Sequence, residues 1–371
     1  MRPYRVGWRL RRARLIRVPW LNSLFKVVPK NPFHAVTEAK PGRTIQGIFG
    51  SLSTKRAGAD KSEDMALSYG ELERFYESFV SRARAGGIPC AITSGMACVN
   101  FGVAQTTRDC DVLCAWEAAE RLLALLADFR LAGVTPAYRG NLSAPLDARW
   151  LRGGWTSHFV WNAADAEAYL DVFGVAPRGS SAWQSEVSGL YASLHTVAEM
   201  KRTDRDKDWP CVTALGLKLL EAGDARGWLH LFDADLMLEL LTRVPCPAEM
   251  VARRPSLQLA VQGDGRLKQA LRVEREFWEE LDRARLRVYE QAVRPYHAAV
   301  RKARLPPDAS LSAQHEARVQ CAEQFLALNP LRVHGLEALI QESRTELLKL
   351  FPPALLEWLP DVRDNFRLLL E

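Results

Sequence analysis

Residues 109–115 read Asp-Cys-Asp-Val-Leu-Cys-Ala, and this run constrains the fold more than any other part of the sequence. Side chains alternate faces along a β-strand, so a strand here places Asp109 and Asp111 on one face and the two cysteines and the valine on the other. Two neighbouring carboxylates repel each other, which is tolerated where a divalent cation neutralises them. The run therefore predicts a strand with one buried apolar face and one acidic, metal-binding face.

Two further features belong with this strand. Ser94 and Gly95 open a helix-like run at 96–101, and small residues there let backbone N–H groups approach a phosphate. A third acid, Asp171, lies among apolar residues in the middle of another strand-like run. Three strand-borne acids beside a phosphate loop are what two-metal phosphoryl transfer needs, since one ion holds the triphosphate and the other lowers the pKa of the attacking hydroxyl.

The order of expected elements from residue 68 onwards indicates an α/β or α+β core. Ser68 followed by Glu71 indicates a capping box at the start of the first helix. Beyond about residue 186 helical periodicity dominates, and 266–304 is expected to be one long charged helix or a bent pair. The expected helices before that are 68–86, 96–101 and 117–129, and the expected strands are 89–93, 109–115, 155–161 and 169–175.

Together, residues 94–111 resemble the nucleotidyltransferase superfamily, whose pattern is a Gly-Gly or Gly-Ser pair, a spacer about as long as the one here, Asp-x-Asp and a later third acid. The closer resemblance is to the bacterial abortive-infection and toxin–antitoxin branch, which shows Gly-Gly-x-Ala, a Gly and Arg-x-Thr-x-Asp-x-Asp. This chain has Ser-Gly-Met-Ala at 94–97, Gly102 and Gln-Thr-Thr-Arg-Asp-Cys-Asp at 105–111. Ser94 thus replaces the first Gly, and Gln105 replaces the Arg.

A second block, residues 199–209, reads Glu-Met-Lys-Arg-Thr-Asp-Arg-Asp-Lys-Asp-Trp. It is similar to a helix of that branch on which a Lys, then Arg and Lys-Asp, face the nucleotide. Lys201 and Asp208 are seven residues apart, two helical turns, so on one helix they share a face. An ordinary solvated helix of mixed charge is the other interpretation of this block.

The resemblance implies an α+β fold, with a small mixed sheet flanked by helices and a helical C-terminal region. It implies an enzyme that moves a nucleotidyl group from an NTP to a hydroxyl acceptor, an RNA end or a protein side chain, in the manner of a toxin. In this interpretation Asp109, Asp111 and Asp171 are catalytic and bind Mg²⁺ or Mn²⁺. The residues expected to bind the nucleotide are Ser94, Gly95, Thr107, Lys201, Arg205 and Asp208.

Other classes of protein remain open. A non-catalytic binding module that kept the fold, with or without the nucleotide, is one alternative, and a structural partner protein that uses its helical half is another. The three acids favour the enzyme, whereas Ser94 and Gln105 mildly favour the module. For Asp171, a capping or salt-bridged acid is the ordinary interpretation.

The net charge of +6 is unevenly distributed. Residues 1–60 hold 13 Lys and Arg against two acids, whereas the remaining residues hold 37 against 42. A basic arm with interleaved aromatics suits an RNA backbone, although its aromatics could equally pack on the body. We expect an arm and linker at 1–64, a nucleotidyltransferase-like domain at 65–215 and an α-helical domain at 216–371.

The composition, 48% hydrophobic and 25% charged, is typical of a soluble globular protein. No stretch approaches the ~20 apolar residues of a membrane span, so no membrane partner is expected. Seven scattered cysteines without a CxxC motif predict buried thiols in a reducing cytoplasm. The toxin–antitoxin resemblance adds a neutralising antitoxin protein to the expected partners.

Overall fold

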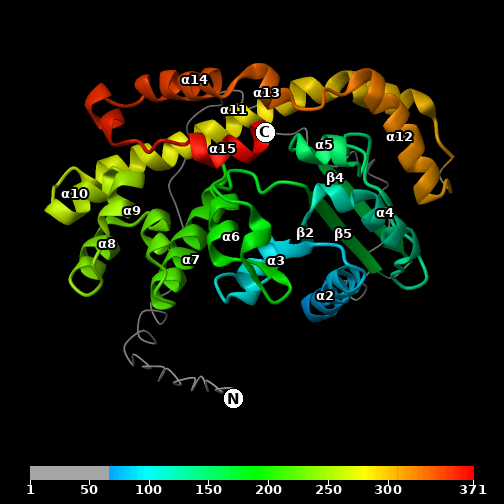
Figure 1. The fold of residues 1–371 in the computed structure, drawn as a ribbon, viewed down its shortest axis with the longest axis horizontal. Helices are drawn as coiled ribbons and strands as arrows, with labels where there is room; N and C mark the ends of the chain where they lie inside the picture. The colour runs from blue at the N-terminus through cyan, green and yellow to red at the C-terminus, as the bar shows by residue number, and fades with distance from the viewer. Residues whose placement is uncertain (1–66, 165, 307) are drawn as a thin grey trace, which may run out of the picture. The chain divides into compact units, whose positions relative to one another are not determined.

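The computed structural model describes residues 67–164, 166–306 and 308–371, so the predicted basic arm at 1–64 lies outside the described residues. Residues 61–371 form one compact unit. Within it, a seven-stranded mixed sheet is surrounded by helices, which confirms the α+β class (Figure 1). No described helix is both long and apolar enough to cross a lipid bilayer.

The strands follow the order β3-β4-β5-β2-β1-β7-β6 across the sheet. The central strand β2 runs parallel to β5 and antiparallel to β1, and β4 runs antiparallel to β5. All four strands expected from the sequence are present, whereas β3, β6 and β7 have two residues each, too few to show an alternating pattern. The strand bounds are β1 Cys90–Thr93, β2 Asp109–Cys114, β3 Ala137–Tyr138, β4 Thr156–Ala163, β5 Ala166–Phe173, β6 Val187–Ser188 and β7 Tyr191–Ala192.

The register of these strands brings four polar side chains into one row. Asp111 of β2 lies opposite Asp171 of β5 on one side and Thr93 of β1 on the other. Asp171 in turn lies opposite His158 of β4. Residues directly opposite each other on neighbouring strands share a face of the sheet. We call His158, Asp171, Asp111 and Thr93 the polar row, and Asp109 lies on the same face, two residues before Asp111.

The opposite face of the sheet packs into the core. The side chains of β2 that alternate with the acids are fully buried, as the sequence predicted: Cys110, Val112 and Cys114. Helices α2 (Tyr69–Ala85) and α4 (Ala119–Asp128) contribute to the same apolar cluster. Trp161 of β4 packs edge-on against Phe75 of α2 and donates to the Phe129 carbonyl, directly after α4. The predicted capping box is also confirmed, since Glu71 accepts from the N–H and the hydroxyl of Ser68.

Two short helices lie beside the polar row. Helix α3 (Ser94–Asn100) begins directly after β1, so its first residue follows Thr93. Helix α6 (Leu194–Met200) ends against the same strand, because the Thr93 hydroxyl donates to the Met200 sulfur at 3.2 Å. The polar face of the sheet is therefore flanked by the start of α3 and the end of α6.

The C-terminal half is helical and is organised around one long helix, α11, with α13, α14 and α15 alongside it (Figure 1). The expected charged helix at 266–304 is confirmed as a single helix, with Pro295 inside it. The remaining bounds are α5 Ala148–Arg152, α7 Trp209–Glu221, α8 Ala234–Leu241, α9 Ala248–Arg253, α10 Ser256–Gln262, α11 Leu267–Ala303, α12 Leu311–Phe325, α13 Pro330–His334, α14 Leu336–Leu348 and α15 Arg363–Leu370.

The two halves share a core. Trp150 of α5 and Trp155 are buried in the same cluster as the apolar side of α11. The Trp155 indole donates to the Ala327 carbonyl at 2.8 Å, and the Tyr289 hydroxyl donates to the Gly153 carbonyl at 2.8 Å. The domain boundary predicted after residue 215 falls within α7 and stays a prediction.

Candidate functional site

Asp111 lies at the centre of the site, partly buried on the polar face of β2. Burial, together with the negative charge of Asp171, raises the pKa of Asp111 to about 6. The Ser94 hydroxyl and the Lys201 ammonium act in the opposite direction and only partly offset these effects. Burial and the nearby carboxylate thus both disfavour the ionised form of Asp111, and a cation bound beside it would favour that form.

Asp171 differs from Asp111 because two basic side chains contact it. Arg139 Nη2 lies 2.7 and 3.0 Å from the two carboxylate oxygens of Asp171. His158 Nδ1 lies 2.7 Å from one of the same oxygens. The side chain of Asp171 is 18% exposed, so these contacts are partly shielded from water. Asp171 is therefore charge-balanced within the protein, and Asp111 is not.

The sequence analysis missed Arg139 and His158. Arg139 directly follows the two-residue strand β3, and its N–H donates to the His158 carbonyl at 2.8 Å. Both residues reach Asp171 through pairing across β3, β4 and β5. Only the alternation of the strand at 155–161 could have indicated that His158 faces the acidic side. Nothing local in the sequence marks Arg139.

Ser94, Gly95 and Thr107 meet at the start of α3. Ser94 has a φ of 53°, in the left-handed region that glycine adopts most easily. A Cβ added to Gly95 would lie 2.7 Å from the Thr107 hydroxyl oxygen, so a side chain there needs Thr107 to move. Helix α3 packs beside β2, and the Ser94 hydroxyl is near enough to Asp111 to lower the pKa of that carboxyl. The predicted phosphate loop and the predicted acidic strand are thus in direct contact.

Lys201 and Asp208 also meet, although not in the predicted way. The block 199–209 is not one helix: α6 ends at Met200, and the chain turns before α7 starts at Trp209. The turn nevertheless brings the Lys201 ammonium to 3.0 Å from an Asp208 carboxylate oxygen, and both side chains are buried. Arg205 pairs with the other oxygen at 2.6 Å. The helical spacing argument was therefore wrong, because α6 ends at Met200 and the two residues do not share a helix.

Lys201 connects this cluster to the acids, since its charge lowers the pKa of Asp111. Asp208 holds Lys201 in place and is itself held by the Thr203 hydroxyl at 2.7 Å. Most of the predicted site residues thus belong to one group, in which each contacts another member or shifts its pKa. Asp109 differs in being exposed at the start of β2.

A divalent cation would fit some of these residues better than others. Among the described residues, no group of three or more His, Cys, Asp and Glu side chains is arranged to hold a metal ion. Asp109 and Asp111 are two carboxylates on one face, and a cation there would offset the burial and the repulsion from Asp171 that raise the pKa of Asp111. These two residues fit one cation. Asp171 fits a second ion only once Arg139 has left it, so its metal role stays a prediction.

Comparison with known proteins assigns no family to this chain. No family model matches it, and neither a curated protein nor a solved structure matches it. The functional interpretation consequently depends on the site itself.

Proposed function

We propose that this protein is a metal-dependent nucleotidyltransferase that moves a nucleotidyl group from a nucleoside triphosphate to a hydroxyl acceptor. The observation that carries this proposal is the in-register pairing of Asp111 with Asp171 on parallel strands, next to Ser94. The charged residues of the site and the glycine at the start of α3 support the binding of a triphosphate with its metal ion.

Each residue of the site has a separate part in this proposal. Asp109 and Asp111 would hold Mg²⁺ or Mn²⁺, which when bound neutralises the triphosphate and polarises it for displacement. Gly95 lets the backbone at the start of α3 lie close to Thr107, where a Cβ would be 2.7 Å from the hydroxyl oxygen, and its N–H would donate to a phosphate oxygen. Lys201, fixed by Asp208, offsets the negative charge of the triphosphate. Arg205 pairs with Asp208 and keeps this cluster together.

Asp171 would face the acceptor. A carboxylate that accepts a hydrogen bond from the attacking hydroxyl orients it and receives its proton. Arg139 forms a two-oxygen contact with Asp171 in this structure, and guanidinium groups make the same contact with phosphate. In our proposal Arg139 exchanges Asp171 for a phosphate oxygen when the nucleotide binds, which frees Asp171 for the acceptor.

The proposed partners follow from the same reaction. The acceptor is an RNA end or a protein side chain, and the basic arm at 1–64 is the proposed RNA contact. An antitoxin protein that neutralises the enzyme is a further proposed partner. The cytoplasm is the proposed location, because all seven cysteines are unpaired thiols.

A second candidate function is a nucleotide-binding module without catalysis. The engagement of both Asp171 oxygens by Arg139 is the observation that favours it. In such a module Arg139 stays on Asp171, and the nucleotide binds without reacting.

A transfer assay distinguishes the two candidates. The protein is incubated with Mg²⁺ and each α-labelled NTP, with total RNA and with protein acceptors, and label transfer is followed on gels. The enzyme transfers label, Asp111→Asn and Asp171→Asn abolish transfer, and the exposed Asp235→Asn on α8 serves as the matched control. Mg²⁺-dependent nucleotide binding without transfer to any acceptor would support the module instead. Calorimetry that detects no Mg²⁺-dependent binding of any NTP would exclude both.

A further inference from the structure

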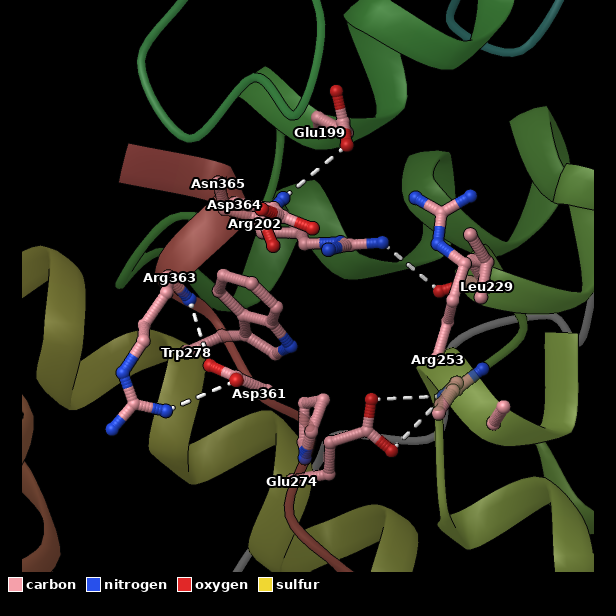
Figure 2. Close-up of a pocket in the computed structure, with 13 residues that line it drawn as sticks. Glu199, Arg202, Leu229, Arg253, Glu274, Trp278, Asp361, Arg363, Asp364 and Asn365 are labelled. Carbon is pink, nitrogen blue, oxygen red and sulfur yellow. Dashed lines mark hydrogen bonds and ion pairs between the residues drawn. The ribbon is translucent and has the colours of Figure 1, made fainter. Parts of the chain in front are cut away.

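A separate cavity of about 380 Å³ lies at the C-terminal end of α6. Its lining comes from Glu199 and Arg202, from α9, from α11 and from the segment that leads into α15 (Figure 2). No residue of the polar row lines it, and neither do Ser94, Lys201 or Asp208. The cavity is therefore distinct from the proposed nucleotide site.

Three hydrogen-bond donors in the cavity lining have no partner. Arg202 Nε, Arg254 Nη2 and Trp278 Nε1 are all buried, and none of them donates a hydrogen bond to an acceptor among the described residues. The three side chains are 5%, 2% and 2% exposed. Figure 2 shows the Trp278 indole nitrogen facing the open space between Arg202 and Glu274. Buried donors are normally paired, so three in one cavity indicate a missing acceptor.

The lining cannot supply that acceptor itself, because its buried carboxylates are already engaged. Glu274 accepts from Arg254 Nε at 2.8 Å and from the Ser256 hydroxyl at 2.6 Å. Glu199 accepts from the Ser180 N–H at 3.0 Å and from the Asn365 amide at 3.2 Å. The two buried carboxylates of the lining therefore already have other donors, and neither accepts from the three unpartnered ones.

The donors are also held in place. Arg202 donates to the Leu229 carbonyl at 3.0 Å and contacts His230 Nδ1 at 3.0 Å, and its guanidinium lies 4.6 Å from the centre of the Trp278 ring. Arg254 Nη1 donates to the Trp228 carbonyl at 2.8 Å. Fixed donors lose little conformational entropy when a ligand binds.

The charge of the lining limits the charge of the ligand. Four arginines, at 202, 253, 254 and 363, face four acids, at 199, 274, 361 and 364. This balance favours a ligand with a single negative charge over a triphosphate. We propose that the cavity binds a small molecule through one oxyanionic group, a carboxylate or a singly charged phosphate, whose oxygens accept hydrogen bonds from Arg202, Arg254 and Trp278.

The proposal is tested by calorimetry and thermal unfolding of the full chain with acetate and with inorganic phosphate, in EDTA. Sodium chloride at equal ionic strength controls for general salt effects. We expect saturable binding of at least one anion, and the anion that binds identifies which oxyanion the cavity takes. Trp278→Phe removes one donor and should weaken binding about five- to tenfold. Trp183→Phe is the matched control, since its indole nitrogen is also buried without a partner but does not line the cavity.

A second variant, at an exposed residue of the cavity, keeps the test valid if the Trp278→Phe protein does not fold. Arg253 is exposed at the cavity, so Arg253→Gln should fold normally and weaken binding about two- to threefold, whereas Arg332→Gln on α13 should not. Asp111→Asn should leave anion binding unchanged, which separates this site from the proposed nucleotide site. Absence of saturable binding for both anions, or equal weakening by Trp278→Phe and Trp183→Phe, would overturn the proposal.

Discussion

Asp111 and Asp171 lie directly opposite each other on parallel strands, and only Asp171 is in direct contact with an arginine, Arg139. Neighbouring strands are about 4.8 Å apart, so like charges placed opposite each other are destabilising. Arg139 and His158 contact Asp171 from one side, whereas burial and the charge of Asp171 together raise the pKa of Asp111. Because no arginine in the described part of the chain contacts Asp111, a cation bound beside Asp111 would stabilise the site more than one bound beside Asp171.

The first prediction concerns pH. Folding raises the pKa of Asp111 from 3.8 to about 6, so the unfolded chain releases this proton at a lower pH than the folded protein. The free energy of unfolding therefore decreases as pH rises from about 4 to about 6. Asp111→Asn should therefore stabilise the metal-free protein by about 1–3 kcal/mol at pH 7.5 and hardly at all at pH 4. Chemical denaturation at both pH values measures this, with Asp235→Asn as the control. An equal gain at both pH values would contradict it.

The second prediction concerns Arg139. Replacing it with Gln removes the cation that occupies Asp171, so Mn²⁺ affinity of the protein without nucleotide should rise about tenfold, the effect of one nearby charge. Calorimetry measures the affinity. Arg149→Gln is a suitable control, because Arg149 pairs with Asp147 and Glu323 away from the polar row. If Arg139 also moves to the nucleotide, the same variant should bind NTP more weakly. An unchanged Mn²⁺ affinity would show that Asp171 is no metal ligand.

The third prediction concerns the space at Gly95. An added methyl group would lie 2.7 Å from the Thr107 hydroxyl, so Gly95→Ala should cost about 1–3 kcal/mol of stability. Thr107→Ala removes that hydroxyl and should recover part of the loss in the double variant, which a double-mutant cycle in denaturant detects. Gly265→Ala is the control, because a Cβ at Gly265 would meet no other atom. Gly263→Ala is unsuitable, because Gly263 has a φ of 64°, which strains an alanine. Strict additivity of the two changes would rule out this contact.

The fourth prediction concerns the buried pair of Lys201 and Asp208. Burial acts to raise the pKa of Asp208, but Lys201, Thr203 and Arg205 lower it overall, so its ionised form stabilises the fold above its unfolded pKa of 3.8. Asp208→Asn leaves a buried ammonium unpaired and should cost about 3 kcal/mol at pH 7. The loss should shrink as pH falls below 3.8. A loss that is constant from pH 7 to pH 3 would show that the charge is not its cause.

The fifth prediction concerns RNA. Deleting residues 1–56 removes 13 Lys and Arg and one acid. If the arm contacts RNA phosphates, the logarithmic salt dependence of RNA binding should become shallower by about 0.7–0.9 for each lost contact. Filter binding between about 50 and 300 mM KCl measures the slope. Over this range the Debye length changes about two- to threefold. An unchanged slope would assign the acceptor contact to another surface.

The sequence predicted those parts of the fold that local patterns specify. Alternation placed Cys110 and Val112 in the core and the acids of β2 on the other face, and the long helical pattern gave α11. It could not give Arg139, because that residue reaches Asp171 through pairing with strands far along the chain.

Helical periodicity misled at residues 199–209. Lys201 and Asp208 have helical spacing, but a polar turn separates α6 from α7 and brings the two together by another path. Their proximity depends on hydrogen bonds from the Thr203 hydroxyl and from Arg205, which no periodic pattern encodes.

Gly153 illustrates how the helical half is attached. A Cβ there would lie 1.8 Å from the Leu328 carbonyl oxygen, so backbone touches backbone at this point, and the neighbouring Trp155 indole is bonded to the next segment of the chain. A fragment ending near residue 215 would leave Trp150 and Trp155 uncovered and prone to aggregate. The helical half is therefore not a separable domain, and its surface residues can be changed more safely than its backbone.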